Sequence, residues 1–335
     1  MIDRERINFL KQNGYHKYPM TMQMEITREC PFNCPQCYKI ELGTMHMDFN
    51  LLKKMITDGI RNGVSLFVLN GGEPLLYPHF IDALKLFKGV DNVSINCFSS
   101  GYGLTDEIIE AIKETTQLRF YISLNGSTDE VNSTSRQGYN VSIKAIEKLK
   151  AHDCPFGVNW VARKDNVHDF ENMIKFCRDN KVMQFSVTSN KLAEKKSKIC
   201  QPIDDGDIKH IARLIKENPD VNITSESCFP QLTAEFRKLT EYDGCAAGYS
   251  NVNISIDGEF LPCTHLYYPE KFDSLEEYWE KSEVLKRLRS CGRCTNCSKN
   301  CRHCKAMSVE SYNNFGEGIV SCRETTEEFK EGEAS

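Results

Sequence analysis

Three cysteines at the spacing C-x3-C-x2-C are the residues of this sequence with the clearest chemical potential. They are Cys30, Cys34 and Cys37. Three thiolates so spaced can hold a cubic four-iron cluster and leave one iron without a protein ligand. An open iron can chelate a substrate, as the open position of a catalytic metal does. The triplet therefore predicts a catalytic cluster, while a zinc site or a chance group of buried thiols is the alternative interpretation.

Three short polar or glycine-rich segments follow further predicted strands. They are Gly71-Gly72-Glu73-Pro74, Ser99-Ser100-Gly101 and Ser123-Leu124-Asn125-Gly126. Glycines allow the backbone to approach a ligand closely. Because the carboxyl ends of parallel barrel strands meet at one mouth, these segments and the cysteine loop are expected to surround one site.

In this order, the cysteine triplet and the three segments resemble the radical S-adenosylmethionine (SAM) superfamily. In that family SAM chelates the open iron, and one electron cleaves it to methionine and a 5′-deoxyadenosyl radical, which takes hydrogen from unactivated C–H bonds. The resemblance implies that Glu73 and nearby backbone carbonyls bind the methionyl ammonium of SAM. The cofactor-binding residues it implies are Gly71, Gly72, Glu73, Ser99, Ser123, Asn125, Arg136 and Tyr38.

The sequence departs from the family pattern at several positions. Gln36 stands where an aromatic residue near adenine is usual, and Tyr38 follows the triplet instead. Asn125 stands where an aspartate is usual, which retains a hydrogen-bonding amide but loses a negative charge. Arg136 resembles an arginine that lies near SAM in related enzymes, with a solvated loop cation as the alternative.

Composition indicates a soluble enzyme that binds neither nucleic acid nor a membrane. The chain has 335 residues and a net charge of −5, and its basic residues are dispersed, so no electrostatic footprint for nucleic acid is visible. No apolar stretch of about 18 residues occurs, and the N-terminus has no secretory signal. A cytoplasmic location is expected.

Alternation of apolar runs with helical patterns predicts an α/β fold with a parallel sheet. The expected strands are 20–27, 66–69, 92–98, 118–124, 156–162 and 184–188. The expected helices are 50–62, 105–113, 141–150 and 167–180. The resemblance implies a partial (β/α)6 TIM-like barrel, with SAM at the carboxyl ends of its strands.

The remaining cysteines divide into a C-terminal group and a scattered group. Of the 16 cysteines, eight crowd the C-terminal region, which is the number that two fully ligated four-iron clusters require. They are Cys245, Cys263, Cys291, Cys294, Cys297, Cys301, Cys304 and Cys322. The scattered thiols are Cys97, Cys154, Cys177, Cys200 and Cys228, most of which are expected to be small buried hydrophobes.

The pattern Cys245-x12-Gly258-x4-Cys263 resembles the entry to a SPASM domain, the α+β auxiliary-cluster module of many radical SAM enzymes. The order of the later cysteines matches the family but their spacing does not. In the family, the cysteine after the glycine and the last cysteine of the later group of four share one cluster. By that pattern, one cluster is expected on Cys245, Cys263 and Cys304, with Cys291 a candidate fourth ligand. The second is expected on Cys294, Cys297, Cys301 and Cys322. Structural zinc is the alternative for these pairs.

The expected organisation is an N-terminal extension (1–19), a radical SAM core (20–190), a helical bridge (191–243), a SPASM domain (244–325) and an acidic tail (326–335). SPASM enzymes commonly modify peptides, so the resemblance implies oxidative maturation of a ribosomal peptide, by thioether formation, another cross-link or epimerisation. Sulfatase-type protein maturation and oxidation of a small metabolite are the main alternatives, and a non-catalytic cluster carrier is a remote one.

Expected cofactors are SAM and three four-iron clusters. Expected partners are a peptide substrate and an electron donor of flavodoxin or ferredoxin type. A separate protein is expected to bind the leader segment of the peptide, unless the substrate is recognised by another route. An epimerase would need a thiol to return hydrogen, for which Cys228 and Cys97 are the candidates.

Overall fold

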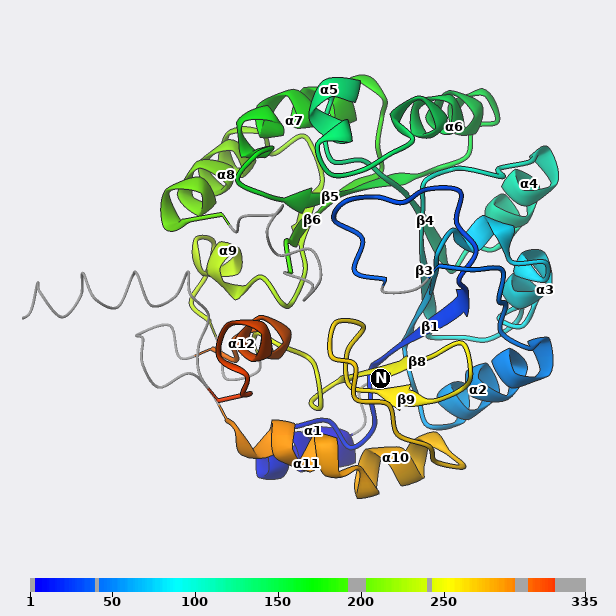
Figure 1. Ribbon diagram of the computed structural model, residues 1–335, viewed down its shortest axis with the longest axis vertical. Helices are drawn as coiled ribbons and strands as arrows, with labels where there is room; N and C mark the ends of the chain where they lie inside the picture. The colour runs from blue at the N-terminus through cyan, green and yellow to red at the C-terminus, as the bar shows by residue number, and fades with distance from the viewer. Residues whose placement is uncertain (1–3, 40–41, 192–202, 240–242, 293–300, 317–335) are drawn as a thin grey trace, which may run out of the picture.

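The computed structural model describes residues 4–39, 42–191, 203–239, 243–292 and 301–316. A nine-stranded sheet in the order β7-β6-β5-β4-β3-β2-β1-β8-β9 curves into an open barrel (Figure 1). Neighbouring strands run parallel except β8 and β9, which form an antiparallel pair. The strands are β1 (Thr21–Thr27), β2 (Leu66–Gly71), β3 (Ser94–Ser99), β4 (Leu118–Ser123), β5 (Gly157–Ala162), β6 (Gln184–Ser189), β7 (Ile223–Ser225), β8 (Asn251–Ile254) and β9 (Phe260–Leu261).

All six strands predicted from the sequence are present, as β1 to β6. Strand β1 shows why they form, since its alternate residues Met22, Met24 and Ile26 are fully buried. A strand paired on both sides can place such a row against the helices that cover the sheet. The expected open α/β barrel is confirmed, and strands β7 to β9 extend it.

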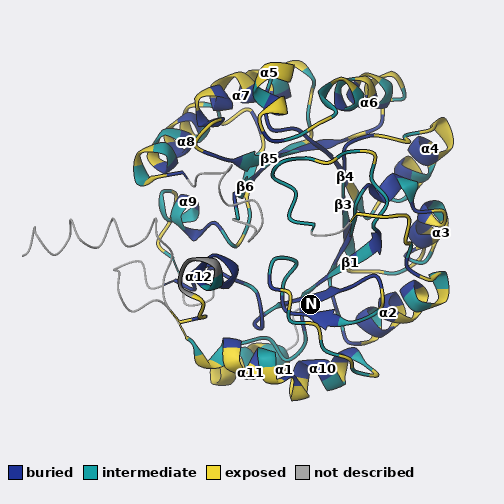
Figure 2. Cartoon of the chain, in the orientation of Figure 1, coloured by how far each residue is buried: buried dark blue, intermediate teal, exposed yellow. Residues whose placement is uncertain are grey.

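Helices line the outside of the sheet, with their buried faces turned inward and their exposed faces outward (Figure 2). In α2, for example, Leu52, Met55 and Ile56 are buried, and Asp48 caps the first turn by accepting a hydrogen bond from the Leu51 N–H. The helices are α1 (Arg4–Asn13), α2 (Phe49–Arg61), α3 (Phe80–Lys85), α4 (Asp106–Glu114), α5 (Asp129–Ser133), α6 (Tyr139–Ala151), α7 (Phe170–Asp179), α8 (Asp205–Glu217), α9 (Pro230–Ala234), α10 (Leu275–Lys281), α11 (Glu283–Ser290) and α12 (Lys305–Tyr312), with short 3-10 turns η1 (Pro74–Leu76) and η2 (Val167–Asp169).

The C-terminal part of the chain shares the barrel sheet. Strand β8 pairs in parallel with β1, with Met24 opposite Ile254. The turn from β8 to β9 passes through Gly258, whose φ of +81° is readily adopted only by glycine. The segment expected as a helical bridge also contributes strand β7, which pairs with β6.

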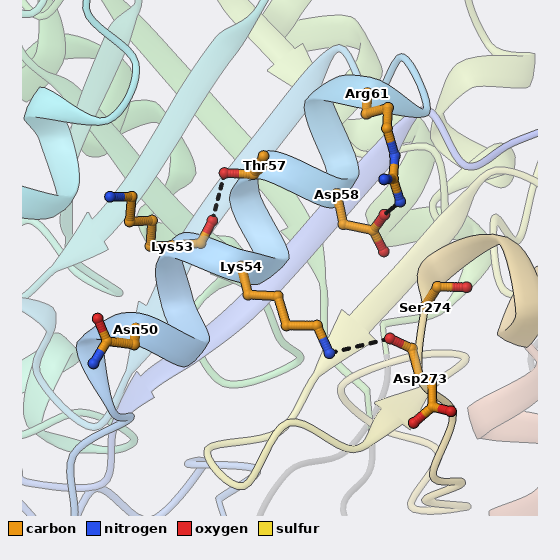
Figure 3. A pocket seen from close by; sticks show the side chains of 8 residues that line it. All are labelled: Asn50, Lys53, Lys54, Thr57, Asp58, Arg61, Asp273 and Ser274. Carbon is orange, nitrogen blue, oxygen red and sulfur yellow. Dashed lines mark hydrogen bonds and ion pairs between the residues drawn. The ribbon is translucent and has the colours of Figure 1, made fainter.

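A groove between α2 and the start of α10 lies on the outer surface (Figure 3). There Asp58 Oδ2 accepts a 2.7 Å hydrogen bond from the Leu275 N–H, which ties the C-terminal part to the barrel. The lining residues are Asn50, Lys53, Lys54, Thr57, Asp58, Arg61, Asp273 and Ser274, none of which the sequence assigned to the site. No described helix combines the length and apolar character needed to span a bilayer.

Candidate active site

The cysteine loop follows β1 and is held by the loop between α5 and α6. The N–H of Asn33 donates to Gln137 Oε1 (2.9 Å), and the N–H of Gln36 donates to the Ser135 carbonyl (3.2 Å). In return, the N–H of Gln137 donates to Cys34 Sγ (3.4 Å). Two segments about a hundred residues apart therefore form one unit, and the backbone donates directly to one of the predicted ligand sulfurs.

Gly138 lets the two loops approach this closely. Its φ is +82°, and a Cβ at this position would lie 2.5 Å from the Phe32 ring. The Phe32 ring also packs edge-on against Tyr102, with centroids 6.0 Å apart. Phe32 therefore lies in a slot that requires glycine opposite it.

Cys30, Cys34 and Cys37 are half-buried thiols on this loop. Burial raises the pKa of Cys30 to about 11, partly opposed by the Phe32 N–H, which donates to its sulfur. Ligation of iron by these thiols would release their protons. No three Cys, His, Asp or Glu side chains within the described ranges converge on one metal-ion position. A cubane does not require such convergence, because each thiolate binds a different iron.

The turn after β2 packs directly on the cysteine loop. The Gly72 N–H donates to the Thr27 carbonyl, and the Glu73 N–H donates to the Glu29 carbonyl, both at 2.7 Å. A Cβ on Gly72 would lie 2.4 Å from the Glu29 oxygen, and one on Gly71 would lie 2.8 Å from the Thr27 oxygen. Both glycines are therefore needed for backbone contact with the loop that carries the cysteines.

The side chain of Glu73 is 1% exposed and fully engaged. Its Oε1 accepts from the Ser99 hydroxyl (2.6 Å) and the Leu75 N–H (3.3 Å), and its Oε2 accepts from the Ser100 N–H (2.8 Å) and hydroxyl. A carboxylate accepts about four hydrogen bonds, so its capacity is used. Burial raises the pKa of Glu73 despite these donors. The expected contact of this carboxylate with SAM stays a prediction, and within the chain Glu73 joins the ends of β2 and β3.

Asn125 and Ser123 lie buried at the end of β4. Asn125 donates from Nδ2 to the Ser135 hydroxyl (2.8 Å) and accepts at Oδ1 from the Val161 N–H (3.2 Å). The amide that replaces the usual aspartate thus connects β4, β5 and the loop that holds the cysteines. Both its donor and its acceptor are used, whereas an aspartate could keep the contact to Ser135 only by accepting from that hydroxyl.

Two arginines face this region with unpaired buried nitrogens. The Nε of Arg136 and that of Arg163 are buried without a hydrogen-bond partner among the described residues. Arg163 follows β5, is 0% exposed, and donates to Gln36 Oε1 (3.4 Å) and to Asp165. Unpaired guanidinium donors suit an anionic group such as the SAM carboxylate. Arg163 belongs to no recognisable motif, so sequence reasoning could not identify it.

Tyr38 connects the cysteine loop to the C-terminal part of the chain. Its ring lies 4.6 Å from the His265 ring, and the Lys39 ammonium lies 5.2 Å from its centroid. Lys39 in turn pairs with Glu25 at 2.7 Å. Burial raises the pKa of Tyr38 and lowers that of His265 to about 3. Tyr38 therefore packs against the region of the auxiliary thiols, where the sequence suggested a position around SAM.

Five of the eight C-terminal cysteines belong to the described residues, and Cys294, Cys297 and Cys322 lie outside them. The Cys245 N–H donates to the Arg302 carbonyl (2.9 Å), which brings two distant segments together. Cys304 is buried at the N-cap of α12, while Cys291 stands at the end of α11. Cys301 is also buried.

The structure argues against Cys97 as a hydrogen donor. It is 0% exposed on β3 and belongs to the hydrophobic core. Its neighbour on β2 is Leu69, on the same face as Phe67, whose ring packs 5.0 Å from Phe87. Cys97 therefore faces the covering helices, away from the barrel interior. Its pKa is well above the ordinary value because of burial.

Comparisons with known proteins identify the domain that carries this site. The Radical SAM superfamily model matches residues 24–177. The chain is 22% identical over 324 residues to the PqqA peptide cyclase of Ruegeria pomeroyi, covering 87% of this chain and 81% of that one. It is 21% identical over 339 residues to the AdoMet-dependent heme synthase of Methanosarcina barkeri, covering 91% and 96%.

Solved structures share the fold over almost the whole chain. Streptococcus suis SuiB bound to its precursor peptide SuiA superposes with a TM-score of 0.78 at 18% identity, covering 95% of this chain and 79% of that one. The enzyme anSMEcpe with AdoMet and the Cp18Cys peptide gives a TM-score of 0.71 at 15% identity, covering 93% and 96%. Residues 24–177 thus form a radical SAM domain, and the chain that carries this domain is an enzyme.

Proposed function

We propose that this enzyme oxidatively modifies a peptide by hydrogen abstraction and passes the released electron to an auxiliary iron–sulfur cluster. The observation that carries this proposal is the contact of Tyr38 with His265. Tyr38 directly follows the third cysteine of the triplet, and His265 lies two residues after Cys263. A single ring pair therefore connects the two predicted cluster regions, which favours electron exchange between them.

A peptide substrate is supported by the relatives. One is named a peptide cyclase, and two of the similar structures contain a bound peptide. The electron balance also fits this chemistry. Forming a new bond with loss of a second hydrogen leaves one electron, which an auxiliary cluster can accept.

The residues of the site would have three roles: ligation of the cluster, binding of SAM and positioning of the backbone. Cys30, Cys34 and Cys37 would hold the catalytic cluster, and the Nε donors of Arg136 and Arg163, which have no partner among the described residues, would bind the carboxylate of SAM. When bound, the cluster and SAM supply the 5′-deoxyadenosyl radical. The remaining residues, Gly71, Gly72, Glu73, Ser99, Ser123 and Asn125, would fix the backbone around them.

The test is an anaerobic incubation of reconstituted enzyme with SAM, dithionite and a short peptide encoded beside its gene. We expect 5′-deoxyadenosine to form faster with the peptide, and the peptide to lose the mass of the hydrogens removed. A flavodoxin or ferredoxin should replace dithionite, and a leader-binding protein is needed if the isolated peptide does not bind. An unmodified peptide that binds in the presence of that partner would contradict the proposal.

A small-metabolite substrate is the second candidate, favoured by the heme synthase relative. The same incubation distinguishes the two, since oxidation of an added tetrapyrrole without any effect of the peptide would establish the second function. The same assay also includes peptides with a sulfatase-type cysteine or serine motif, which test sulfatase-type maturation.

A further inference from the structure

We propose that Cys228 completes, with Cys245, Cys263 and Cys304, a site of four thiolates for one auxiliary iron–sulfur cluster. The inference rests on the proposed function, because it names the ligands of an auxiliary cluster that this function needs. The spacing pattern left the fourth ligand open, with Cys291 as the candidate, and Cys228 stands apart from the other three in the sequence.

The four thiols gather from four separate segments. The Cys228 thiol hydrogen-bonds to that of Cys245. It also lies within electrostatic range of the Cys263 and Cys304 thiols, which are within range of each other. Cys228 is thus the member that interacts with all three others. Cys228 directly precedes Phe229, the N-cap residue of α9, and Cys304 is the N-cap residue of α12.

Backbone contacts hold the other three thiols in place. Pairing with Arg302 fixes Cys245, through hydrogen bonds in both directions at 2.9 and 3.1 Å. The His265 N–H donates to Cys263 Sγ at 3.4 Å, and Cys304 is fixed as the N-cap residue of α12, where its carbonyl accepts from the Ser308 N–H at 3.1 Å. A donor to sulfur, such as the His265 N–H, stabilises a cluster thiolate.

The segment carrying Cys228 is anchored to the end of β6. The Glu226 N–H donates to the Val187 carbonyl (3.3 Å), and Glu226 Oε1 accepts from the N–H and the hydroxyl of Ser189 at 2.7 and 2.8 Å. The Phe229 N–H then donates to the Glu226 carbonyl (3.1 Å), which closes a turn around Cys228. This anchoring places the thiol where a barrel strand ends.

Charge also favours a cluster here. The Lys191 ammonium is 2.6 and 2.8 Å from the two carboxylate oxygens of Glu226 and lies within electrostatic range of Cys228, Cys263 and Cys304. Its side chain is 8% exposed. A buried anionic cluster needs nearby positive charge, which this lysine supplies.

Cys291 is placed differently. Its thiol donates to the Arg287 carbonyl (3.2 Å), one turn back in its own helix, and it lies near Tyr249. It stands at the end of α11, whereas the Cys228 thiol hydrogen-bonds to that of Cys245.

The test uses the full chain with Cys30, Cys34 and Cys37 replaced by Ala, so that only auxiliary clusters remain. Into this background we would introduce C228A, C228S and C291A, with C177A as the control for loss of a buried thiol outside the group. Each protein is reconstituted anaerobically, its iron and sulfide are counted, and its clusters are examined by Mössbauer and EPR spectroscopy.

We expect C228A and C228S to lower the iron content and to give a three-iron EPR signal on oxidation, while C291A and C177A leave the Cys228-dependent cluster unchanged. If C291A gives that signal and both Cys228 variants do not, Cys291 is the ligand and the inference is overturned. Unchanged clusters in the Cys228 variants would overturn it, and altered stereochemistry of the peptide product of C228A made in the wild-type chain would then assign hydrogen donation to this thiol instead. A background protein that binds no iron would refute the auxiliary clusters themselves, and the proposed electron path with them.

Discussion

The backbone N–H of Ser100, just after β3, donates a 2.8 Å hydrogen bond to the carboxylate of Glu73, just after β2. This bond and its three companions bind the ends of adjacent strands at the mouth of the open barrel. Because Glu73 continues the backbone that packs on the cysteine loop, its carboxylate positions the SAM site without having to touch the cofactor.

Replacing Glu73 by Gln should therefore weaken both stability and SAM binding. The new amide group would turn a donor toward the Ser99 and Ser100 donors, at a cost of about 1–3 kcal/mol for a buried group left unpaired. The matched control, S99A, removes one donor and should cost about 1 kcal/mol. Thermal unfolding and calorimetric SAM titration measure the two effects. A Gln variant that unfolds and binds SAM like the wild type would show that the network has no such role.

Gly138→Ala should reduce occupancy of the catalytic cluster. The added methyl would overlap the Phe32 ring, at 2.5 Å, and displace the loop that carries the cysteines. Gly14→Ala is the control, since Gly14 has a similar φ of +75° but nothing within 4 Å of the added carbon. We expect the Gly138 variant alone to lose iron after reconstitution. Equal iron content in the two variants would mean that the contact with Phe32 does not shape the loop.

Lys191→Met should lower the reduction potential of the nearby auxiliary cluster. Burial lowers the pKa of Lys191, but the Glu226 carboxylate more than compensates, so the pKa is raised and the side chain stays cationic. Loss of a buried cation disfavours the more negative, reduced cluster. E226Q should shift the potential upward, and the double variant should fall between the single ones. EPR-monitored redox titration measures these shifts, and identical potentials would exclude a cluster near Lys191.

Asp58→Ala should loosen the C-terminal part of the chain from the barrel. The buried Leu275 N–H would lose its acceptor, at a cost of about 1–3 kcal/mol. Lys54→Ala, which removes an exposed contact to the Asp273 carbonyl on the same groove, should change stability by less than about 0.5 kcal/mol (Figure 3). Hydrogen–deuterium exchange at the α10 amides is the measurement. Equal protection in both variants would show that Asp58 does not hold this helix.

Much of the barrel could be predicted because its signals are local. The buried alternation of Met22, Met24 and Ile26 identifies β1 without knowledge of its neighbours. Strand β8 was harder, because it has only four residues and is defined by pairing with β1, more than two hundred residues away. Pairing at such a distance leaves no periodic trace in the sequence.

The residues of the site likewise differ in whether their role depends on local sequence or on contacts made by folding. Cys30, Cys34 and Cys37 are recognisable because their spacing lies within one loop, whereas Arg163 and Cys228 acquire their significance only from residues brought beside them by folding. The hydrogen bonds of Glu73 with Ser99 and Ser100 could not be predicted from the sequence either, because they depend on the register of β2 against β3.

The most direct test of the account is 5′-deoxyadenosine formation from SAM under dithionite by the anaerobically reconstituted enzyme, compared with the variant in which Cys30, Cys34 and Cys37 are Ala. We expect the wild type to form 5′-deoxyadenosine, and the variant to form none while retaining its auxiliary iron. SAM cleavage that persists in the variant would contradict the assignment of the catalytic cluster to this loop.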